Sequence, residues 1–394
     1  MGFYTEPAFF VLLALTAVPA IVLGCMEKRI RVYGFVVSLV FVALLFGGSL
    51  PEAAALVFFL ILSFAMQAWV THLFRSDHPR AVPLYRIALA ANLAPLVIYK
   101  ISAVFDANLL GFLGISYMTF KAVQVLIEIR DGLIERVSPL DYFYFLLFFP
   151  AFTTGPIMRS RPFVSDVDQA PSRAEYLDGL ALGAVRFLAG AVYKFVFASL
   201  AYWAWWFLPQ VIGYGSLGAS VASELCISVT YAAYLFFDFA GYSFMAMGAG
   251  AAFGVDVPRN FKLPFLAQDV KDFWNRWHMT LTFWLRDFVF MRLTAFLIER
   301  RVFKSRVTTA CLGFVAIMTL MGCWNGLTFD YISCGVFFGL AMAATELFQR
   351  KSRLYKANKK KTWFKVMSWA LTMVWVLIGL SFFSGQIGRL IFGG

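Results

Sequence analysis

Charged side chains are scarce in this chain of 394 residues. Asp, Glu, Lys and Arg together make up 14% of the sequence, whereas an average soluble domain contains about 25%. Hydrophobic residues account for 61% and aromatic residues for 18%. The composition therefore excludes an ordinary soluble protein and predicts one embedded in lipid.

Cysteine and histidine are also scarce, and neither is arranged as a set of metal ligands. The histidines are His72, His78 and His278, and the cysteines are Cys25, Cys226, Cys311, Cys323 and Cys334. The cysteines lie within apolar segments and lack the paired spacing of a metal site. We predict no metal site and interpret the cysteines as packing residues.

Acidic residues are outnumbered by basic ones, which gives a formal net charge of +12. In a soluble chain such an excess would suggest a nucleic-acid partner. Here the cations gather in short loops between apolar runs, where they would face anionic lipid headgroups. We therefore predict contact with a lipid bilayer and no nucleic-acid partner.

Apolar runs separated by short polar joints recur along the whole chain. They cover approximately residues 8–25, 33–48, 53–70, 87–104, 107–127, 142–158, 178–207, 222–253, 307–323, 331–348 and 364–384. Most reach the roughly 20 residues that a membrane-spanning helix requires. No internal repeat or long linker divides them. The sequence predicts an all-α polytopic membrane protein with about 10–12 membrane segments, a few of them re-entrant, in a single domain over residues 1–394.

The distribution of cations predicts the orientation of the chain. Residues 1–7 carry one charged side chain, Glu6, and lack the basic stretch of a signal peptide, so we expect the first apolar run to be retained as a helix. Lys and Arg gather at residues 28–31, 75–86 and 350–365. Because such cations accumulate in cytoplasmic loops, we predict an N-terminus outside the cell and these loops in the cytoplasm.

The segment from Lys271 to Leu293, KDFWNRWHMTLTFWLRDFVFMRL, combines tryptophans with polar residues. At helical spacing one narrow face carries Lys271, Asn275, His278, Thr282 and Arg286, and another carries Trp274, Trp277, Leu281, Leu285 and Phe288. The pattern predicts one amphipathic helix, at the membrane interface or lining a polar cavity. Asp272 and Arg276, four residues apart, are expected to pair.

His278 is the most informative residue of that polar face. An ionisable side chain aligned with polar groups on a membrane-associated helix is a candidate for a functional site. The alternative is an imidazole that only hydrogen-bonds a neighbouring helix. A merely interfacial helix would explain the tryptophans but not the histidine.

Three other places put polar groups inside apolar runs. Asp238, in YLFFDFAGYSF, requires a partner or a wet cavity, and it serves either substrate binding or a helix-to-helix hydrogen bond. Residues 149–161 are too rich in Pro and Gly for a straight helix, and form either a re-entrant turn near a pore or a surface loop. A third set predicts a buried polar network and consists of Lys121, Gln124, Glu128 and Asp131.

Together these segments resemble the core of the membrane-bound O-acyltransferases. The resemblance rests on YLFFDFAGYSFMAMGAG, on NFKLPFLAQDVKDFWNRWH and on the segment that follows, and extends to residues 113–134 and 146–163. Within the family the chain resembles the D-alanyl transfer branch more than the alginate O-acetyltransferase branch, because RDFVFMRL stands where the latter has a Pro-Leu-Gly-Gly turn. The similarity covers approximately residues 110–348.

The resemblance implies a helical bundle around a funnel whose floor is joined to the cytoplasm by a narrow tunnel, in a multi-pass protein of the bacterial cytoplasmic membrane. It implies that a D-alanyl carrier protein presents D-alanine as a phosphopantetheine thioester, with no cofactor bound covalently to the chain itself. The acceptor would be a hydroxyl on teichoic acid or a related polymer, reached with other membrane proteins of the D-alanylation system.

Candidate site residues follow from the polar face and from the resemblance. Acyl transfer to a hydroxyl needs a base and an oxyanion donor, and a neutral imidazole suits the first task near pH 7. The candidate catalytic residues are His278 and Asn325, and the candidate substrate-binding residues are Asp238, Asn275, Thr282, Arg286 and Trp324. A basic and apolar segment suits docking of an acidic carrier protein and contains Phe296, Ile298, Arg300, Arg301 and Lys304.

One position departs from the family pattern. The family's second histidine stands in a Gly-x-Trp-His-Gly motif, whereas this chain reads GCWNG from Gly322 and has Asn325 at that place. Asn cannot act as a base, although its amide can donate a hydrogen bond. Three accounts are open: an inactivated member of the family, a base role taken over by His278, or a protein that binds and passes substrate without catalysis.

Three rival functions accompany the leading hypothesis of D-alanyl transfer. The first is O-acetylation of an exported polysaccharide, which uses the same chemistry. The second is a catalytically silent scaffold that binds the carrier protein, a reading favoured by Asn325. The third is a transporter, which the helix breaks and intramembrane charges would allow.

Overall fold

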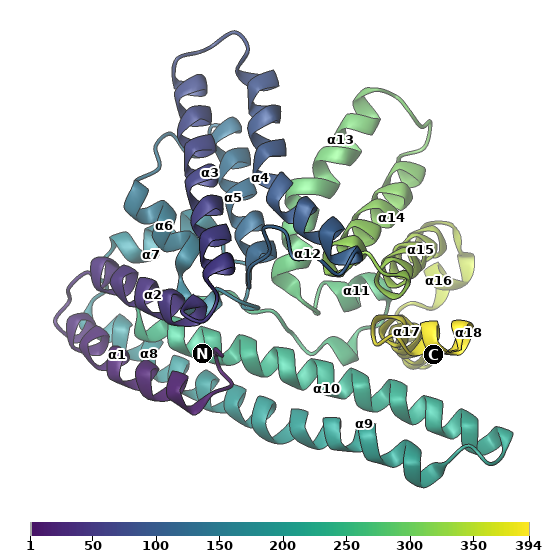
Figure 1. The fold of residues 1–394 in the computed structure, drawn as a ribbon. Helices are drawn as coiled ribbons and strands as arrows, with labels where there is room; N and C mark the ends of the chain where they lie inside the picture. Colours follow the sequence, from purple (N-terminus) through teal and green to yellow (C-terminus); the bar gives the residue numbers. More distant parts are fainter. Residues whose placement is uncertain (1, 394) are drawn as a thin grey trace. The chain divides into compact units, whose positions relative to one another are not determined.

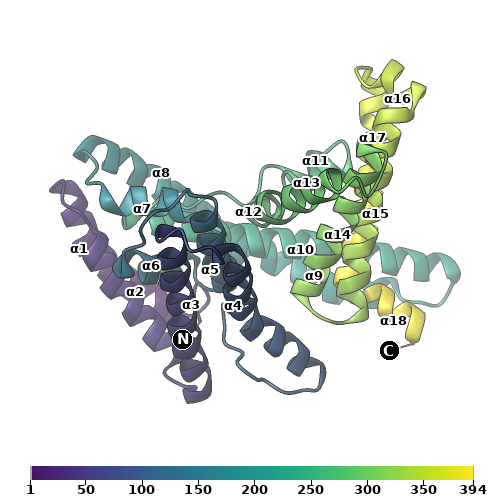
Figure 2. The ribbon, with the colours of Figure 1, turned by 90° about the horizontal axis from the view of Figure 1, so that it is seen from above.

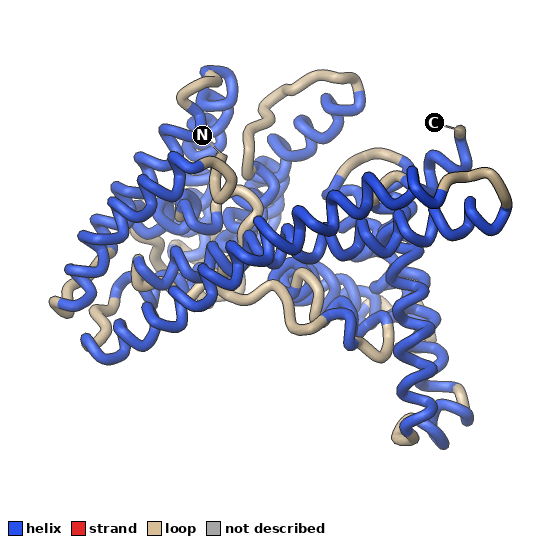
Figure 3. Tube along the Cα trace, turned by 90° about the horizontal axis from the view of Figure 1, so that it is seen from below, coloured by secondary structure: helices blue, strands red, loops and turns tan. Residues whose placement is uncertain are grey.

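A computed structural model describes residues 2–393, which form helices and loops without any strand (Figure 3). The prediction of an all-α protein is confirmed. The helices group into two compact units. The first contains the residues up to Ala191 together with Tyr242–Pro258, and the second contains Val192–Gly241 together with the residues from Arg259 onward.

The first unit contains the N-terminal helices labelled in Figure 1. They are α1 (Pro7–Cys25), α2 (Arg31–Phe46), α3 (Leu50–Arg75), α4 (Ala81–Val104), α5 (Ile115–Arg130), α6 (Pro139–Leu147), the 3₁₀ turn η1 (Phe149–Ala151), α7 (Ser160–Asp168) and α8 (Arg173–Val192). Aromatic side chains fill the core: the rings of Phe41 and Phe149 stack with centroids 4.1 Å apart. Helix α1 coincides with the first apolar run, as predicted.

The second unit contains the elements that carry most of the candidate site. They are the π-helical turn η2 (Tyr193–Phe197), α9 (Ala198–Ile212), the N-terminal part of α10 (Leu217–Ala252), the 3₁₀ turn η3 (Pro264–Leu266), α11 (Val270–Trp274), α12 (Met279–Leu285), the π-helical turn η4 (Arg286–Phe290), α13 (Met291–Glu299), α14 (Arg306–Asn325), α15 (Phe329–Lys351), α16 (Arg353–Asn358), α17 (Thr362–Phe383) and α18 (Gln386–Phe392). Figure 2 shows α15 and α17 side by side, and they pack directly on each other.

Within residues 2–393, eight helices are long and apolar enough to cross a membrane by length and composition. They are α1, α3, α4, the continuous helix Arg173–Ile212, α10, α14, α15 and α17. The other predicted runs form the shorter apolar helix α2, the buried helix α5 and an interrupted segment around residue 150. The multi-pass membrane architecture is therefore confirmed, with fewer full-length spans than the number of membrane segments predicted.

The interrupted segment follows α6 and stays inside the protein. Phe148 leaves helical geometry before η1, and turns continue as far as α7. Most residues from 149 to 158 are buried, and Thr153 hydrogen-bonds Tyr242 of the same unit at 2.5 Å. The predicted helix break is confirmed, and the burial favours a turn enclosed by protein over a surface loop.

The polar face of α5 is paired within the first unit. Lys121 donates to the carbonyl oxygen of Phe145 at 3.0 Å, and the Ser160 hydroxyl donates to Glu128 while accepting from Gln124. A buried ammonium or carboxylate without such partners would cost several kcal/mol, on the order of its desolvation penalty. The predicted network is confirmed for these residues of α5. Asp131 lies beyond the helix end, where it is exposed.

Glycines let α14 and α15 approach closely in the second unit. A Cβ atom added to Gly335 would lie 2.3 Å from the carbonyl oxygen of Met318, and one added to Gly339 would lie 2.7 Å from the Cα of Val315. Both obstacles are backbone atoms, which cannot move aside as a flexible side chain can. The two helices therefore depend on small residues at this contact, as helix pairs in membranes commonly do.

We predict that Gly335→Ala lowers the thermal stability of the purified chain in detergent. Alanine improves helix propensity by up to about 1 kcal/mol, but overpacking against backbone costs about 1–3 kcal/mol, so the loss should exceed the gain. Gly218→Ala is the matched control, because a Cβ at that helical glycine of the same unit meets no atom within 4 Å. Equal melting temperatures for both variants would contradict the close approach.

Candidate functional site

The predicted helix over 271–293 is interrupted, and its continuity was predicted wrongly. α11 ends at Trp274, and α12 begins only at Met279. Between them the backbone turns aside because two of its groups pair with an earlier segment: Lys262 N–H donates to the Arg276 carbonyl, and Met279 N–H donates to the Asn260 carbonyl, each at 2.9 Å. These long-range hydrogen bonds replace those that a continuous helix would make.

His278 occupies the corner of this interruption. Its backbone is left-handed, with φ 42°, a conformation that a non-glycine residue adopts only when its surroundings hold it there. The side chain is 6% exposed. Its ring lies edge-on to Phe239 of α10, with centroids 4.7 Å apart, and 6.3 Å from the ring of Trp324. Three separate parts of the second unit therefore meet at the imidazole.

Asn260 determines which imidazole nitrogen carries the proton. Its Oδ1 accepts from the backbone N–H of Thr280 at 3.4 Å and from the Thr280 hydroxyl at 2.6 Å. A backbone N–H can only donate, so the Asn260 atom facing it is an acceptor. His278 Nδ1, 3.3 Å from the same Oδ1, must then donate. The proton therefore sits on Nδ1, and Nε2 presents a lone pair.

The environment of His278 keeps the imidazole neutral. The residue lies between the candidate spans α10 and α14, and burial lowers the pKa of its side chain well below the ordinary value because the cation would lose hydration. Its buried Nε2 has no hydrogen-bond partner among residues 2–393. A neutral imidazole with an unpaired lone pair in a held orientation is chemically able to accept a proton from a hydroxyl brought next to it.

Trp324 and Asn325 close α14 beside this imidazole. Trp324 makes the ring contact with His278, and Asn325 is the last residue of the helix before the extended Gly326. The Asn325 amide donates to the carbonyl oxygen of Met321 at 2.9 Å. The segment carrying the family's second histidine position therefore lies next to the first, and the amide at position 325 behaves as a donor.

The interruption separates the other residues of the predicted polar face. Lys271 forms an ion pair with Glu346 of α15 at 2.7 Å, whereas Asn275 is exposed. Thr282 bonds the backbone of its own segment, and Arg286 pairs with the adjacent Asp287. A single continuous stripe was therefore the wrong geometry. Binding roles for Asn275, Thr282 and Arg286 stay predictions.

Two predicted pairings have clear outcomes. Asp272 and Arg276 form an ion pair at 2.8 Å, as their spacing predicted. Asp238 pairs with Lys194 of η2 at 2.5 Å, so its carboxylate is compensated by a neighbouring helix. That contact corresponds to the helix-to-helix alternative for Asp238, and substrate binding by this residue stays a prediction.

The predicted docking segment forms an exposed apolar and cationic surface on α13 and the loop after it. Phe296 is 51% exposed and Ile298 45% exposed. Arg300, Arg301 and Lys304 are exposed beside them, and the Arg300 guanidinium lies 5.3 Å from the centre of the Phe296 ring. Exposed apolar side chains next to several cations are suited to contact with an acidic protein partner.

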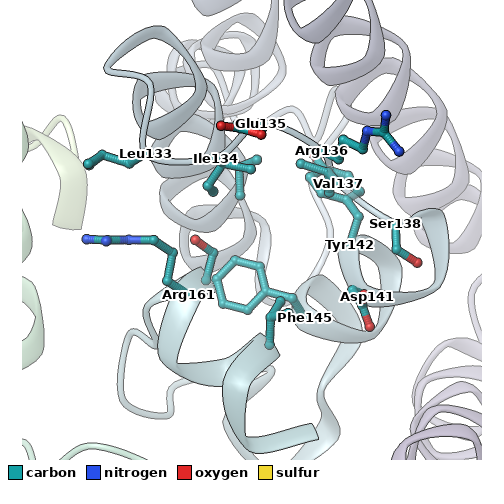
Figure 4. Close-up of a pocket in the computed structure, with 13 residues that line it drawn as sticks. Leu133, Ile134, Glu135, Arg136, Val137, Ser138, Asp141, Tyr142, Phe145 and Arg161 are labelled. Carbon is teal, nitrogen blue, oxygen red and sulfur yellow. The ribbon is translucent and has the colours of Figure 1, made fainter. Parts of the chain in front are cut away.

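A cavity in the first unit does not have the features of the candidate site. It has a volume of about 300 Å³ and is lined by parts of α5, α6, α7 and the loop before α6. Figure 4 shows the side chains of Arg136 and Arg161 extending to opposite sides rather than converging. Within the described residues, no group of three or more His, Cys, Asp or Glu residues is placed to hold a metal ion.

Sequence reasoning singled out His278 but missed Asn260. Asn260 lies 18 residues earlier in a segment without regular structure. Its type and spacing resemble those of many loop asparagines, so no local pattern points to it. The only signal was its place in NFKLPFLAQDVKDFWNRWH, the stretch that carries the family resemblance.

Nitrogen-15 NMR of histidine can test the assigned tautomer. In a chain carrying His72→Asn and His78→Asn, the remaining imidazole should be neutral, protonated on Nδ1, and unchanged as the pH falls from about 8 to about 5, because its pKa is lowered by burial. Asn260→Ala should shift the proton toward Nε2, whereas Thr282→Val should not. An imidazole that titrates in this range, or one protonated on Nε2 in the parent, would contradict the assignment.

Comparisons with known proteins identify the family of the chain. Residues 55–384 match the sequence profile of the membrane-bound O-acyltransferase family. The chain is 35% identical to a teichoic acid D-alanyltransferase of Bacillus subtilis, over 97% of the chain and 98% of that protein. It is 34% identical to the protein of the same name from Streptococcus thermophilus, over 99% and 96%. It is 32% identical to a probable alginate O-acetylase of Pseudomonas syringae, over 70% and 49%. With a matching profile and near full-length relatives, the chain belongs to the membrane-bound O-acyltransferase family.

Proposed function

We propose that this chain transfers D-alanine from a carrier-protein thioester to a hydroxyl of teichoic acid or a related cell-envelope polymer. The names and near full-length similarity of the relatives support this substrate class. The observation that carries the proposal is the buried, neutral His278, whose Nδ1 is held by Asn260 and whose Nε2 lone pair has no partner among the described residues. Such a group is suited to take a proton in a site that excludes bulk water.

In the proposed reaction, His278 Nε2 takes the proton of the acceptor hydroxyl as its oxygen attacks the thioester carbonyl. The tetrahedral intermediate then collapses, the carbon–sulfur bond breaks, and the ester of D-alanine forms. The proton on Nε2 passes to the departing phosphopantetheine thiolate. Because burial makes the imidazolium unfavourable, His278 would return to its neutral form once the thiol leaves.

Asn325 has a different proposed role. It cannot hold a transferred proton, but its amide can donate to the oxyanion that forms on the carbonyl oxygen. Its place at the end of α14, next to the Trp324 that contacts His278, supports this role. In this proposal His278 is the base, so the base has moved from the family's second histidine position to the first.

The proposed acyl donor is phosphopantetheine on an acidic D-alanyl carrier protein, which docks at Phe296, Ile298 and the cations that follow. We further propose that the basic loops face the cytoplasm and the N-terminus lies outside. A funnel and tunnel would join the two faces, and other membrane proteins of the D-alanylation system would assist delivery to the polymer. Similarity to relatives that act in D-alanylation supports these partners.

Two other functions have specific support. Polysaccharide O-acetylation is suggested by similarity to alginate O-acetylases, but that similarity covers only about half of those proteins. A silent carrier-binding scaffold is suggested by Asn325 alone. A silent scaffold gives no reason for the oriented lone pair of His278, and the O-acetylases match over about half of their length whereas the D-alanyltransferases match over nearly all of theirs, so D-alanyl transfer is favoured.

Transfer can be measured with the full chain in liposomes, labelled D-alanyl carrier protein and a hydroxyl acceptor. The parent should transfer D-alanine, and His278→Ala should be slower by roughly a hundredfold or more, the usual effect of losing a general base. His72→Ala is the matched control and should retain full activity. If only Asn325→His transfers and the parent does not, the chain is a disabled enzyme and the role proposed for His278 is wrong.

Carrier docking can be tested by binding rather than activity. Arg300→Glu with Arg301→Glu should weaken carrier binding by about tenfold or more, which corresponds to about 1.4 kcal/mol, because repulsion replaces attraction to an acidic partner. Arg75→Glu with Arg80→Glu makes the same charge change at exposed positions at the end of α3 and just before α4, and should have little effect. Unchanged affinity in the first variant would remove this docking surface, and absence of binding in every form would remove the proposed donor.

A further inference from the structure

A groove along α15 and α17 is separate from the histidine site and plays no part in the proposed reaction. It has a volume of about 510 Å³, within the usual range of small-molecule sites. Side chains from α15, α16, α17 and the start of α11 line it. All of them belong to the second unit, in the region labelled α15 to α17 in Figure 2.

The two ends of this α15–α17 groove differ in character. At one end Lys359 and Lys365 are exposed, and Lys359 lies 5.8 Å from the centre of the Tyr355 ring. Toward the other end the lining becomes apolar, with Leu340 56% exposed and Leu371 54% exposed. Large apolar side chains left open beside cations form a surface that is amphipathic along its length.

The length of the groove fits one leaflet of a bilayer. Its lining runs from Phe337 to Gln349 on α15 and from Phe364 to Trp375 on α17. At the helical rise these spans are about 18 Å and about 16 Å long, close to half of the roughly 30 Å hydrocarbon core. Both helices are long and apolar enough to cross a membrane, so the groove would open toward the acyl chains of one leaflet.

Charge and aromatic residues mark the headgroup level at the cationic end. Residues 350–365 contain no Asp or Glu. Their cations are Arg350, Lys351, Arg353, Lys356, Lys359, Lys360, Lys361 and Lys365. Trp363, 51% exposed, lies in the first turn of α17 within this stretch, as expected for an aromatic residue at the membrane interface. Basic pockets between membrane helices are suited to anionic lipid headgroups.

The acidic groups near the groove are already paired within the protein. Asp269 accepts from the side-chain amide of Gln349 and from the backbone N–H of Asp272, each at 2.8 Å. Glu346 pairs with Lys271 and Arg350. Asp269 keeps its charge, since its partners are neutral, but among residues 2–393 no ion pair joins Asp269 or Glu346 to Lys359 or Lys365 at the mouth of the groove.

We propose that the α15–α17 groove binds an anionic diacyl phospholipid, with its phosphodiester between Lys359 and Lys365 and an acyl chain along Leu340 and Leu371. A free phosphate would leave the apolar length of the groove unfilled. An acidic protein could contact the exposed cations but would not follow a groove about 16–18 Å along two membrane-crossing helices. An anionic lipid would fill both the cationic end and the apolar end of the groove. Gln349 and Asp269, which form part of the groove wall, would connect the bound lipid to the start of α11.

The test uses the full chain, purified and delipidated in detergent, with lipid binding followed by native mass spectrometry and thermal melting. Phosphatidylglycerol should bind at least fivefold more tightly than phosphatidylcholine of identical acyl chains, and should raise the melting temperature more. Lys359→Gln with Lys365→Gln should abolish this preference. Ala344→Trp, which fills the exposed lining without changing charge, should weaken both lipids, whereas Ala370→Trp on an exposed position outside the lining should not.

Several results would overturn the proposal. Equal binding of the two lipids, or a preference for phosphatidylglycerol retained in the lysine variant, would show that the groove does not distinguish lipid headgroups by charge. Displacement of phosphatidylglycerol by glycerol phosphate at equal concentration would identify a site for a soluble phosphate instead. If the lysine variant loses carrier-protein binding while lipid binding is unchanged, the cations serve a protein partner.

Discussion

Polar groups that lie inside a bilayer find no water to bind, so each must be paired within the protein. This constraint explains much of the architecture described above. Lys121 donates to backbone carbonyls exposed by the end of α6, and Lys194 compensates Asp238. Where the backbone leaves helical geometry between α11 and α12, the segment containing Asn260 and Lys262 supplies the missing hydrogen bonds. Irregular backbone therefore occurs where the protein itself can satisfy it.

The candidate site is the most elaborate case of this rule. Breaking the helix between Trp274 and Met279 frees backbone groups, and the segment around Asn260 satisfies them. The same asparagine then uses its side chain to orient the imidazole. One interruption in a helix thus produces both a strained backbone at His278 and a fixed tautomer, which is the kind of preorganisation that general-base chemistry requires.

Two clusters of cations in the second unit lie on surfaces of different chemistry. Those after α13 stand beside isolated, outward-facing apolar side chains, which suits contact with another protein. Those between α15 and α17 stand at the end of a long apolar groove, which suits a lipid. The net charge of +12 is the sum of such local arrangements, and the apolar residues beside each group distinguish their proposed partners.

The sequence by itself determined the membrane class, most of the long helices and the family, and it singled out His278 and position 325 as candidates. These follow from composition, from the length of apolar runs and from motifs, which are local properties. Only the tertiary structure decided where the 271–293 segment breaks, that Asn260 holds His278, that Lys194 pairs with Asp238 and that α15 and α17 form a groove. Each of these depends on contacts between residues far apart in the chain, and helical periodicity carries no information about partners outside its own helix.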